Sequence, residues 1–247
     1  MQVVFTTVFA IVPSILLLLY FYKRDLNPEP RGALLLTFLF GVLIVVPVVA
    51  VVLPIQSHVK VPAGPFSFGL FTAFLCAAIP EEFFKFIVVT RYSARHRAFD
   101  EPMDGIVYGA TASLGFATFE NIMYVSHGGW ETAIARAFTA VPCHACLGAI
   151  LGYYVGQARF EPGRKAALWW GLLAAILLHG MYDFPLMAMR RMSDEDGGVM
   201  LWSFLALMAA CLLVLVVAII WVLGIVRKLH RAQERAVEQL AVASPTE

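Results

Sequence analysis

The chain has 247 residues, of which 60% are hydrophobic and 14% are charged, and its mean hydropathy is +0.78. Soluble domains of this length usually carry about 25% charged residues, so the composition excludes an ordinary soluble protein and indicates an integral membrane protein. The net charge of +1 gives no overall electrostatic attraction to nucleic acid. The apolar runs are too long and too continuous for barrel strands, which predicts an all-α, polytopic transmembrane helix bundle.

Seven apolar stretches are each long enough to cross a bilayer as a helix, which takes about 20 residues. We expect these spans near residues 3–22, 33–54, 66–90, 104–126, 131–157, 166–188 and 199–226. The first is expected to be a retained helix rather than a signal peptide, because Lys23 and Arg24 follow the apolar run instead of preceding it. Residues 1–226 are therefore predicted to form the membrane bundle, and residues 227–247 a charged helical tail in the cytoplasm.

The basic residues between these spans predict the orientation. If the N-terminus lies outside, thirteen lysines and arginines fall in the cytoplasmic loops and the tail, and the outer loops hold only Lys60, Arg190 and Arg191. This asymmetry is the one that the positive-inside rule describes. We therefore expect an outside N-terminus and a cytoplasmic C-terminus, an alternation that six spans would break.

Glycines recur every four residues in two spans. Gly105 and Gly109 lie in the fourth span, and Gly148, Gly152 and Gly156 lie in the fifth. Small residues at this spacing let helix backbones approach closely. The fourth span is also polar along its length, so it must be buried among other helices. We expect these two spans to form a tight central pair.

Three ionisable residues lie close together in the third span, namely Glu81, Glu82 and Lys85. Each costs about 2.5–3.5 kcal/mol to insert at membrane depth, so their presence needs a reason. Lys85 follows the glutamates by four and three positions and can reach both on one helix face. Two carboxylates with one lysine leave an excess negative charge. This excess favours a metal ion, a proton or a catalytic role over a purely structural ion pair.

Three further spans carry ionisable residues at a compatible depth: Glu120 in the fourth, His144 in the fifth, and His179 with Asp183 in the sixth. His179 and Asp183 share one helix face at i, i+4. This spacing suits either two metal ligands or a carboxylate that orients an imidazole by accepting its ring hydrogen bond. The four helices can therefore converge on one polar pocket.

Other polar residues of the spans are interpreted as structural. Asp104 and Arg136 lie near helix ends, where charged residues commonly anchor a helix. Cys143 and Cys146 have the C-x-x-C spacing of a metal or redox site, but no second cysteine pair completes one, so we interpret them as packing residues.

In three motifs the chain resembles the PrsW family of bacterial intramembrane proteases, within the larger group of prenyl-protein (CAAX) endopeptidases and bacteriocin-processing membrane proteins. The motifs are E-E-x-x-K at Glu81, Glu82 and Lys85, F-x-x-x-E at Phe116 and Glu120, and H-x-x-x-D at His179 and Asp183, with His144 as the family's additional membrane histidine. Their order matches, and the resemblance covers roughly residues 20–190. The prenyl proteases more often carry E-E-x-x-x-R and F-x-x-x-H, which separates this chain from CAAX processing.

The resemblance implies hydrolysis of a peptide bond in or near the membrane, in a single-span substrate such as an anti-sigma factor of the bacterial inner membrane. It implies Glu81 or Glu82 as the general base that activates water. If zinc takes part, the resemblance implies these ligands: His144, His179, Asp183 and Glu120. Without a metal, His144 and His179 would stabilise the oxyanion. Both mechanisms remain open, with zinc as the first expectation.

Two other classes of function are compatible with the residues. A proton- or ion-coupled transporter also places Glu, His and Asp in the membrane, but this chain has no obvious internal repeats and its charges gather at one depth. A non-enzymatic scaffold or immunity protein would keep the fold around an inactive site, whereas every motif position is intact here. Flux into proteoliposomes would reveal a transporter, and a scaffold would tolerate Glu82→Ala and His179→Ala. The expected partners are a membrane-protein substrate and the bilayer, without nucleic acid.

Overall fold

The computed structural model describes residues 2–196 and 201–243, and every element in these two ranges is a helix. In chain order the helices are α1 (Gln2–Arg24), α2 (Arg31–Leu43), α3 (Val45–His58), α4 (Pro65–Leu70), the π-helix η1 (Phe71–Ala78), α5 (Ile79–Arg91), the 3-10 helix η2 (Ser93–Arg95), α6 (Pro102–Phe138), α7 (Ala140–Phe160), α8 (Ala167–Asp196) and α9 (Leu201–Ala243). This confirms the predicted all-α class. The start of the predicted seventh span and the last four residues of the predicted tail lie outside the described residues.

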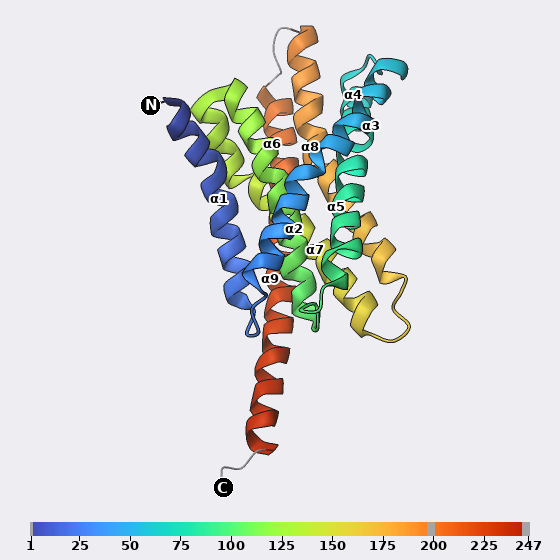
Figure 1. Cartoon of the computed structure of the whole chain (residues 1–247). Coiled ribbons are helices and arrows are strands. Elements are labelled where there is room, and N and C mark those ends of the chain that lie inside the picture. Colours follow the sequence, from blue (N-terminus) through green and yellow to red (C-terminus); the bar gives the residue numbers. More distant parts are fainter. Residues whose placement is uncertain (1, 197–200, 244–247) are drawn as a thin grey trace.

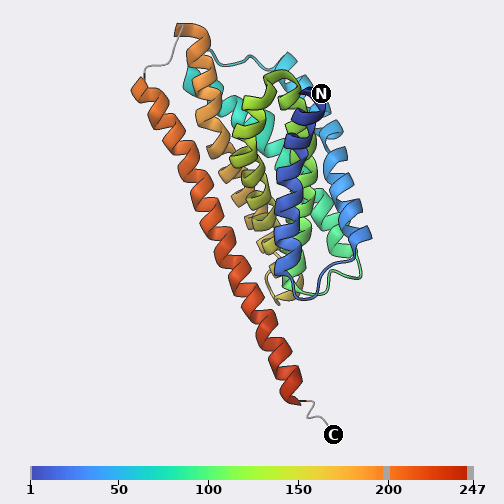
Figure 2. The same ribbon diagram turned by 90° about the vertical axis from the view of Figure 1, so that its left-hand side faces the viewer.

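The helices form an elongated bundle in which the N-terminus and the end of α9 lie at opposite ends (Figure 1). α9 runs along one side of the bundle and continues well beyond it (Figure 2). The residues after Arg227 thus extend the same helix as far as Ala243. The helical form of the predicted tail agrees with its charged, helix-favouring composition, and its separation as a domain stays a prediction.

α6 and α7 pack closely against each other. The first half of α6 is buried almost without interruption, including the polar residues Thr111 and Ser113. A Cβ atom added to Gly105, Gly109 or Gly152 would collide with the backbone of the facing helix. The glycine spacing therefore has the predicted effect, and the polar fourth span is a buried central helix.

The boundary between the fourth and fifth predicted spans was misplaced. α6 continues as far as Phe138, and only Gly129 departs from helical geometry, with φ 68° and ψ −159°. Glycine adopts this conformation readily because it has no Cβ, so the chain turns within a run that otherwise favours helix. α7 then begins at Ala140 instead of near residue 131. The short segment after Gly129 brings Arg136 back toward the first half of α6.

The second and third predicted spans each contain more than one helix. α2 and α3 meet at Ile44, and the third span combines α4, η1 and α5. The π-helix η1 ends where α5 begins, and Pro80 occupies the first turn of α5, where its missing N–H needs no partner. π-helical segments within α-helices are often found at functional sites. Here the π-helix directly precedes Glu81 and Glu82.

Four continuous stretches of the described residues are long and apolar enough to cross a membrane by length and composition: Arg31–His58, Pro102–Phe160, Ala167–Met192 and Leu201–Leu240. The second of these contains both α6 and α7. Large apolar side chains are exposed on the outer helices, such as Val46 on α3 and Leu213 on α9, as contact with lipid would require. The predicted count of seven spans and the predicted orientation stay predictions.

Candidate active site

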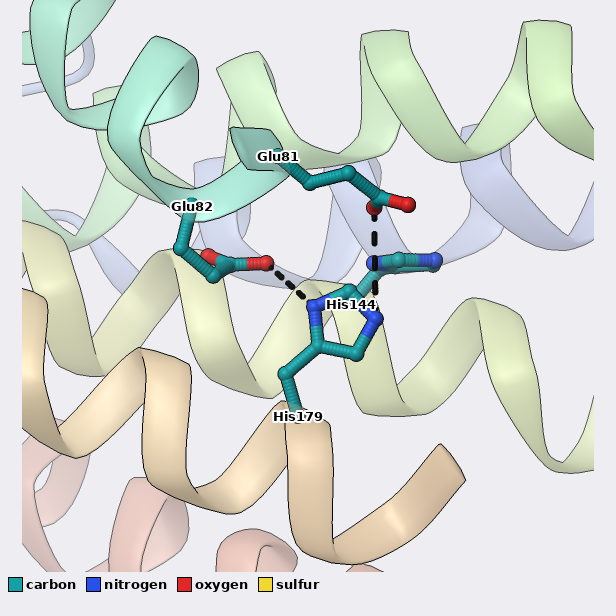
Figure 3. A group of neighbouring side chains, drawn as sticks. All are labelled: Glu81, Glu82, His144 and His179. Atoms are coloured by element: carbon teal, nitrogen blue, oxygen red, sulfur yellow. Dashed lines mark hydrogen bonds and ion pairs between the residues drawn. The ribbon is translucent and has the colours of Figure 1, made fainter. Parts of the chain in front are cut away.

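Four buried side chains from three helices converge inside the bundle (Figure 3). Glu81 and Glu82 come from the first turn of α5, His144 from α7 and His179 from α8. Each contributes one nitrogen or oxygen atom to a group whose members all lie within 4.8 Å of one another. The predicted convergence of these spans on one polar pocket therefore agrees with the geometry.

Lys85 lies among these side chains with its ammonium group fully buried. Its Nζ lies 2.7 Å from Glu82 Oε1, 3.4 Å from Glu81 Oε2 and 3.2 Å from His144 Nδ1. Nζ also lies 4.4 Å from the centre of the Phe116 ring, a distance at which a cation is attracted to an aromatic face. Lys85 thus partly offsets the charge of the two glutamates, and Phe116 covers it from α6.

His179 contacts carboxylates at both ring nitrogens. Its Nδ1 lies 2.8 Å from Glu82 Oε1. Its Nε2 lies 3.2 Å from Asp183 Oδ2 and 3.9 Å from Glu81 Oε2. Asp183 therefore lies where it can accept the ring hydrogen bond of His179, which is the arrangement of a carboxylate that orients an imidazole.

The contacts of His144 define which of its nitrogens carries the hydrogen. The Lys85 ammonium can only donate, so His144 Nδ1 accepts this hydrogen bond. The hydrogen of the neutral ring must then lie on Nε2, which donates to Glu120 Oε2 at 3.0 Å. The ring also forms T-shaped contacts with the rings of Phe116 and His179, with centroids 5.7 Å and 5.1 Å away. Four side chains therefore contact the His144 ring and fix its orientation.

Arg136 was not expected at the site, and its neighbours make it part of the surroundings of His144. Its Nη2 donates to Glu120 Oε2 at 2.5 Å, and its Nε donates to Asn121 Oδ1 at 2.9 Å. Its guanidinium lies 4.2 Å from the centre of the Tyr124 ring. A lone arginine within an apolar stretch was the only signal in the sequence, and the turn at Gly129 was needed to connect it with Glu120.

Two cavities meet at this cluster. A cavity of about 650 Å³ lies between α3 and α6, and its lining includes Glu81 and Glu120 beside valines of α3. A more polar cavity of about 350 Å³ is lined by helices α6 to α9, and its lining includes Glu120, His144 and His179. Glu82 lines neither of the two. The adjacent glutamates therefore differ in access, although they differ by only one position in the sequence.

Comparison with known proteins identifies the family. A model described as "PrsW family intramembrane metalloprotease" matches residues 29–239. The chain belongs to this family. Proteins named Protease PrsW are 45% identical over 195 residues in Geobacillus kaustophilus (77% of this chain, 84% of the relative) and 41% identical over 182 residues in Bacillus subtilis (72% and 81%). In Clostridioides difficile the identity is 30% over 186 residues (72% and 77%). No solved structure matches.

Membership of the PrsW family makes the chain an intramembrane endopeptidase, in agreement with the motifs. This result favours the protease over the transporter and the scaffold. The residues of the three PrsW motifs all lie in or beside the cluster, with Glu120 and Asp183 on the outer sides of His144 and His179. Cys143 and Cys146 are free and buried, as expected of packing residues.

The PrsW family is described as a family of metalloproteases, and the residues of the cluster are of types that bind metal ions. Catalytic zinc commonly takes three ligands from histidine nitrogens and carboxylate oxygens. Two histidines and two glutamates offer such atoms here, and Glu82 Oε2 is buried without a hydrogen-bond partner. This set differs from the one expected from the sequence, because Glu120 and Asp183 contact the histidines from outside. Which set holds a metal stays a prediction.

Proposed function

We propose that this chain hydrolyses a peptide bond of a membrane-spanning protein, with Glu81 as the general base. The observation that supports this role is the difference in access between the two glutamates. Glu81 is 7% exposed and lines the cavity between α3 and α6, whereas Glu82 has no exposed surface. A base must reach the water that it deprotonates, which favours Glu81.

In the proposed reaction, the Glu81 carboxylate takes a proton from a water molecule in the cavity. The oxygen of that water attacks the carbonyl carbon of the scissile peptide bond. The C–N bond then breaks, and the leaving amine receives the proton from Glu81. Negative charge develops on the carbonyl oxygen. His179 lines the polar cavity with its Nε2 3.9 Å from Glu81, so it would donate a hydrogen bond to this oxygen in place of its contact with Asp183.

The remaining motif residues position these two groups. Glu82 accepts hydrogen bonds from Lys85 and His179, so it fixes the orientation of the His179 ring. Glu120 holds His144 from the other side of the site. Lys85 supplies the positive charge that lets two carboxylates remain close together in a buried place.

A zinc ion is compatible with this arrangement. His144, His179 and Glu82 would hold it, since Glu82 Oε2 is buried without a hydrogen-bond partner and Glu81 is the proposed base. When bound, zinc supplies a Lewis acid that polarises a carbonyl oxygen and lowers the pKa of water. Glu81 would then remain as the base.

The cavity between α3 and α6 favours an apolar substrate segment. Its lining combines valines of α3 with Phe116, Phe119 and Met123 of α6, and it reaches Glu81 at the site. Such a wall suits the transmembrane segment of a protein better than a soluble peptide. Together with the family resemblance, this supports a single-span protein such as an anti-sigma factor as substrate, in the bacterial inner membrane.

The test uses the full chain in liposomes with a single-span reporter protein that becomes fluorescent when cut. We expect Glu81→Gln to lower the rate by about 10²- to 10⁴-fold, the usual contribution of a general base. Glu131→Gln is the matched control, because Glu131 is an exposed glutamate of α6. Thermal melting verifies that each variant folds. Full activity of folded Glu81→Gln would contradict the proposed role of Glu81, and full activity of folded Glu81→Gln and Glu82→Gln together would contradict the proposed mechanism.

A further inference from the structure

A second group of buried carboxylates lies at the end of the bundle from which α9 extends (Figure 1). Asp25 and Glu29 belong to the loop between α1 and α2, and Asp104 lies in the first turn of α6. Each offers one oxygen atom to a group whose members lie within 4.8 Å of one another. We refer to these three residues as the acidic cluster.

The acidic cluster is separate from the active site. Asp104 and Glu120 lie on the same helix, sixteen residues apart. At a rise of about 1.5 Å per residue, this places them about 24 Å apart along α6. A ligand of the acidic cluster therefore does not share donors with the active site.

The hydrogen bonds of the acidic cluster satisfy some of its oxygens. Asp104 Oδ2 accepts the backbone N–H groups of Asp100 and Glu101 at 2.6 and 2.7 Å, which caps α6. The other bonds are from Tyr108 Oη to Glu29 Oε2 at 2.6 Å, from the Asn27 backbone N–H to Asp25 Oδ1 at 3.0 Å, and from Gln233 Nε2 to Asp25 Oδ1 at 2.7 Å.

Two oxygens of the acidic cluster have no hydrogen-bond donor. Asp25 Oδ2 and Asp104 Oδ1 are buried and accept no hydrogen bond from a donor group, in residues that are 4% and 0% exposed. The nearest groups to these two carboxyls include two further carboxyls, Glu101 beside Asp25 and Glu29 beside Asp104. Among the described residues, no lysine, arginine or histidine forms an ion pair with the acidic cluster. Burying carboxylates without a positive charge is costly.

We propose that Asp25, Glu29 and Asp104 bind a divalent cation of the hard, oxygen-liganded class, which includes Ca²⁺, Mg²⁺ and Mn²⁺. Carboxylate oxygens are the ligands that these ions prefer. The cation supplies the positive charge that no side chain of the described residues provides there. The two oxygens without a hydrogen-bond donor would be among its ligands. It joins the loop between α1 and α2 to the start of α6.

The same cation connects to α9 through Gln233. This side chain donates both to Asp25 Oδ1 and to Glu101 Oε1, each at 2.7 Å. The Leu26 backbone N–H donates in turn to Gln233 Oε1 at 3.4 Å. A bound cation holds Asp25 in the position that Gln233 contacts, so it stabilises the attachment of α9 to the rest of the bundle.

The test measures metal binding rather than proteolysis. The full chain in detergent carries His144→Ala and His179→Ala, so that the active site contributes little to metal binding, and is freed of metal by a chelator. Ca²⁺, Mg²⁺ and Mn²⁺ are then titrated separately, with bound metal measured by equilibrium dialysis and stability by thermal melting. We expect one of these ions to bind saturably with a single equivalent and to raise the melting temperature, because a ligand that binds only the folded state stabilises it.

Asp25→Asn and Asp104→Asn are each expected to weaken this binding by about tenfold or more, since loss of an outer-shell partner alone commonly costs a metal site about 10- to 100-fold. Asp100→Asn is the matched control, because Asp100 is an exposed aspartate in the loop before α6. Glu29→Gln replaces Asp104→Asn if the latter does not fold.

Three results would count against the proposal. The first is the absence of saturable binding of all three ions at millimolar concentration, with an unchanged melting temperature. The second is equal binding by the parent, Asp25→Asn and Glu29→Gln proteins, which would place the ion elsewhere. A higher melting temperature of Asp25→Asn without metal binding by the parent also counts against a cation, because protons would then neutralise the acidic cluster.

Discussion

At the scale of single residues, Arg136 Nη2 lies 2.5 Å from Glu120 Oε2, although the two residues are sixteen positions apart in the chain. Glu120 in turn accepts the Nε2 hydrogen of His144, and His144 accepts from Lys85. Three successive contacts thus connect the guanidinium of Arg136 with the ammonium of Lys85. We infer that Arg136 is a positioning residue that acts through Glu120 and His144.

Arg136→Ala should lower the rate of cleavage by about 10- to 100-fold, the usual effect of losing a group that orients a functional histidine. The loss should fall mainly on kcat, because Arg136 is not expected to bind the substrate segment itself. Arg136→Lys should recover only part of the rate, since lysine cannot donate to Glu120 and Asn121 in the same geometry. Steady-state kinetics in liposomes measures both constants. Arg164→Ala, which removes an exposed arginine, is the control, and an equal loss there would indicate a general charge effect.

Metal content tests the role of His179. If His179 is a zinc ligand, the wild-type chain purified without chelator should contain about one equivalent of zinc, and folded His179→Ala should lose it. Elemental analysis measures the zinc content, and thermal melting verifies that the variant is folded. A metal-free, active wild-type protein would instead support activation of water by Glu81 alone.

The motif residues could be placed from the sequence because ionisable side chains within apolar spans are costly and few. That argument identified Glu81, Glu82 and His179, and the geometry brings them together. The same argument did not separate Arg136 or Asp104 from ordinary charged residues near helix ends. Their neighbours come from distant parts of the chain, and a single sequence does not reveal such contacts.

At the scale of helices, length and apolar content predicted most elements but not the interruptions within them. Nothing in the run from Phe71 to Ala78 distinguishes a π-helix from an α-helix, since both bury the same apolar side chains. The turn at Gly129 was also missed, because a glycine in an apolar stretch predicts close packing as readily as a turn. The fifth predicted span, which corresponds to α7, consequently begins nine residues later than expected, at Ala140.

The contact of α6 with α7 predicts a sharp difference between two glycines. Gly152→Ala should destabilise the protein by about 1–3 kcal/mol, because its Cβ would meet the backbone of Gly105 and overpack the interface. Gly224→Ala on α9 should be neutral or stabilising by up to about 1 kcal/mol, because its Cβ would meet nothing within 4 Å and alanine favours helix. Thermal melting in detergent compares the two. Equal destabilisation by both substitutions would show that the close approach of α6 to α7 at Gly152 does not determine the loss of stability.

Gly129 should resist substitution for a different reason. Its φ of 68° with ψ of −159° belongs to a region that only glycine occupies readily, so Gly129→Ala should strain the turn by about 1–3 kcal/mol. The strain would move the segment that carries Arg136. We expect a lower cleavage rate with little change in the rest of the fold, measured by activity beside circular dichroism. Wild-type activity of Gly129→Ala would mean that the segment adopts its position without this conformation.

At the scale of the whole molecule, α9 is attached to the bundle at two places along its length. Along the bundle it packs through apolar residues such as Val214 and Ala218, and beyond these Gln233 reaches the loop after α1. Gln233→Ala should lower the stability by about 1–3 kcal/mol, because a hydrogen bond to a charged partner contributes in this range and Asp25 would lose one. Denaturation of the full chain measures the change. Glu238→Ala, on an exposed position of the same helix, should leave the stability unchanged.

The position of Gln233 also orders events during biosynthesis. The ribosome releases the loop after α1 and the start of α6 long before residue 233, so the carboxylates of Asp25 and Asp104 meet each other while the side that Gln233 later covers is still open to water. We expect exchange of ions and protons at the acidic cluster to be faster on the nascent chain and to slow once α9 packs beside it. Binding of a cation there should therefore be easiest before α9 is in place.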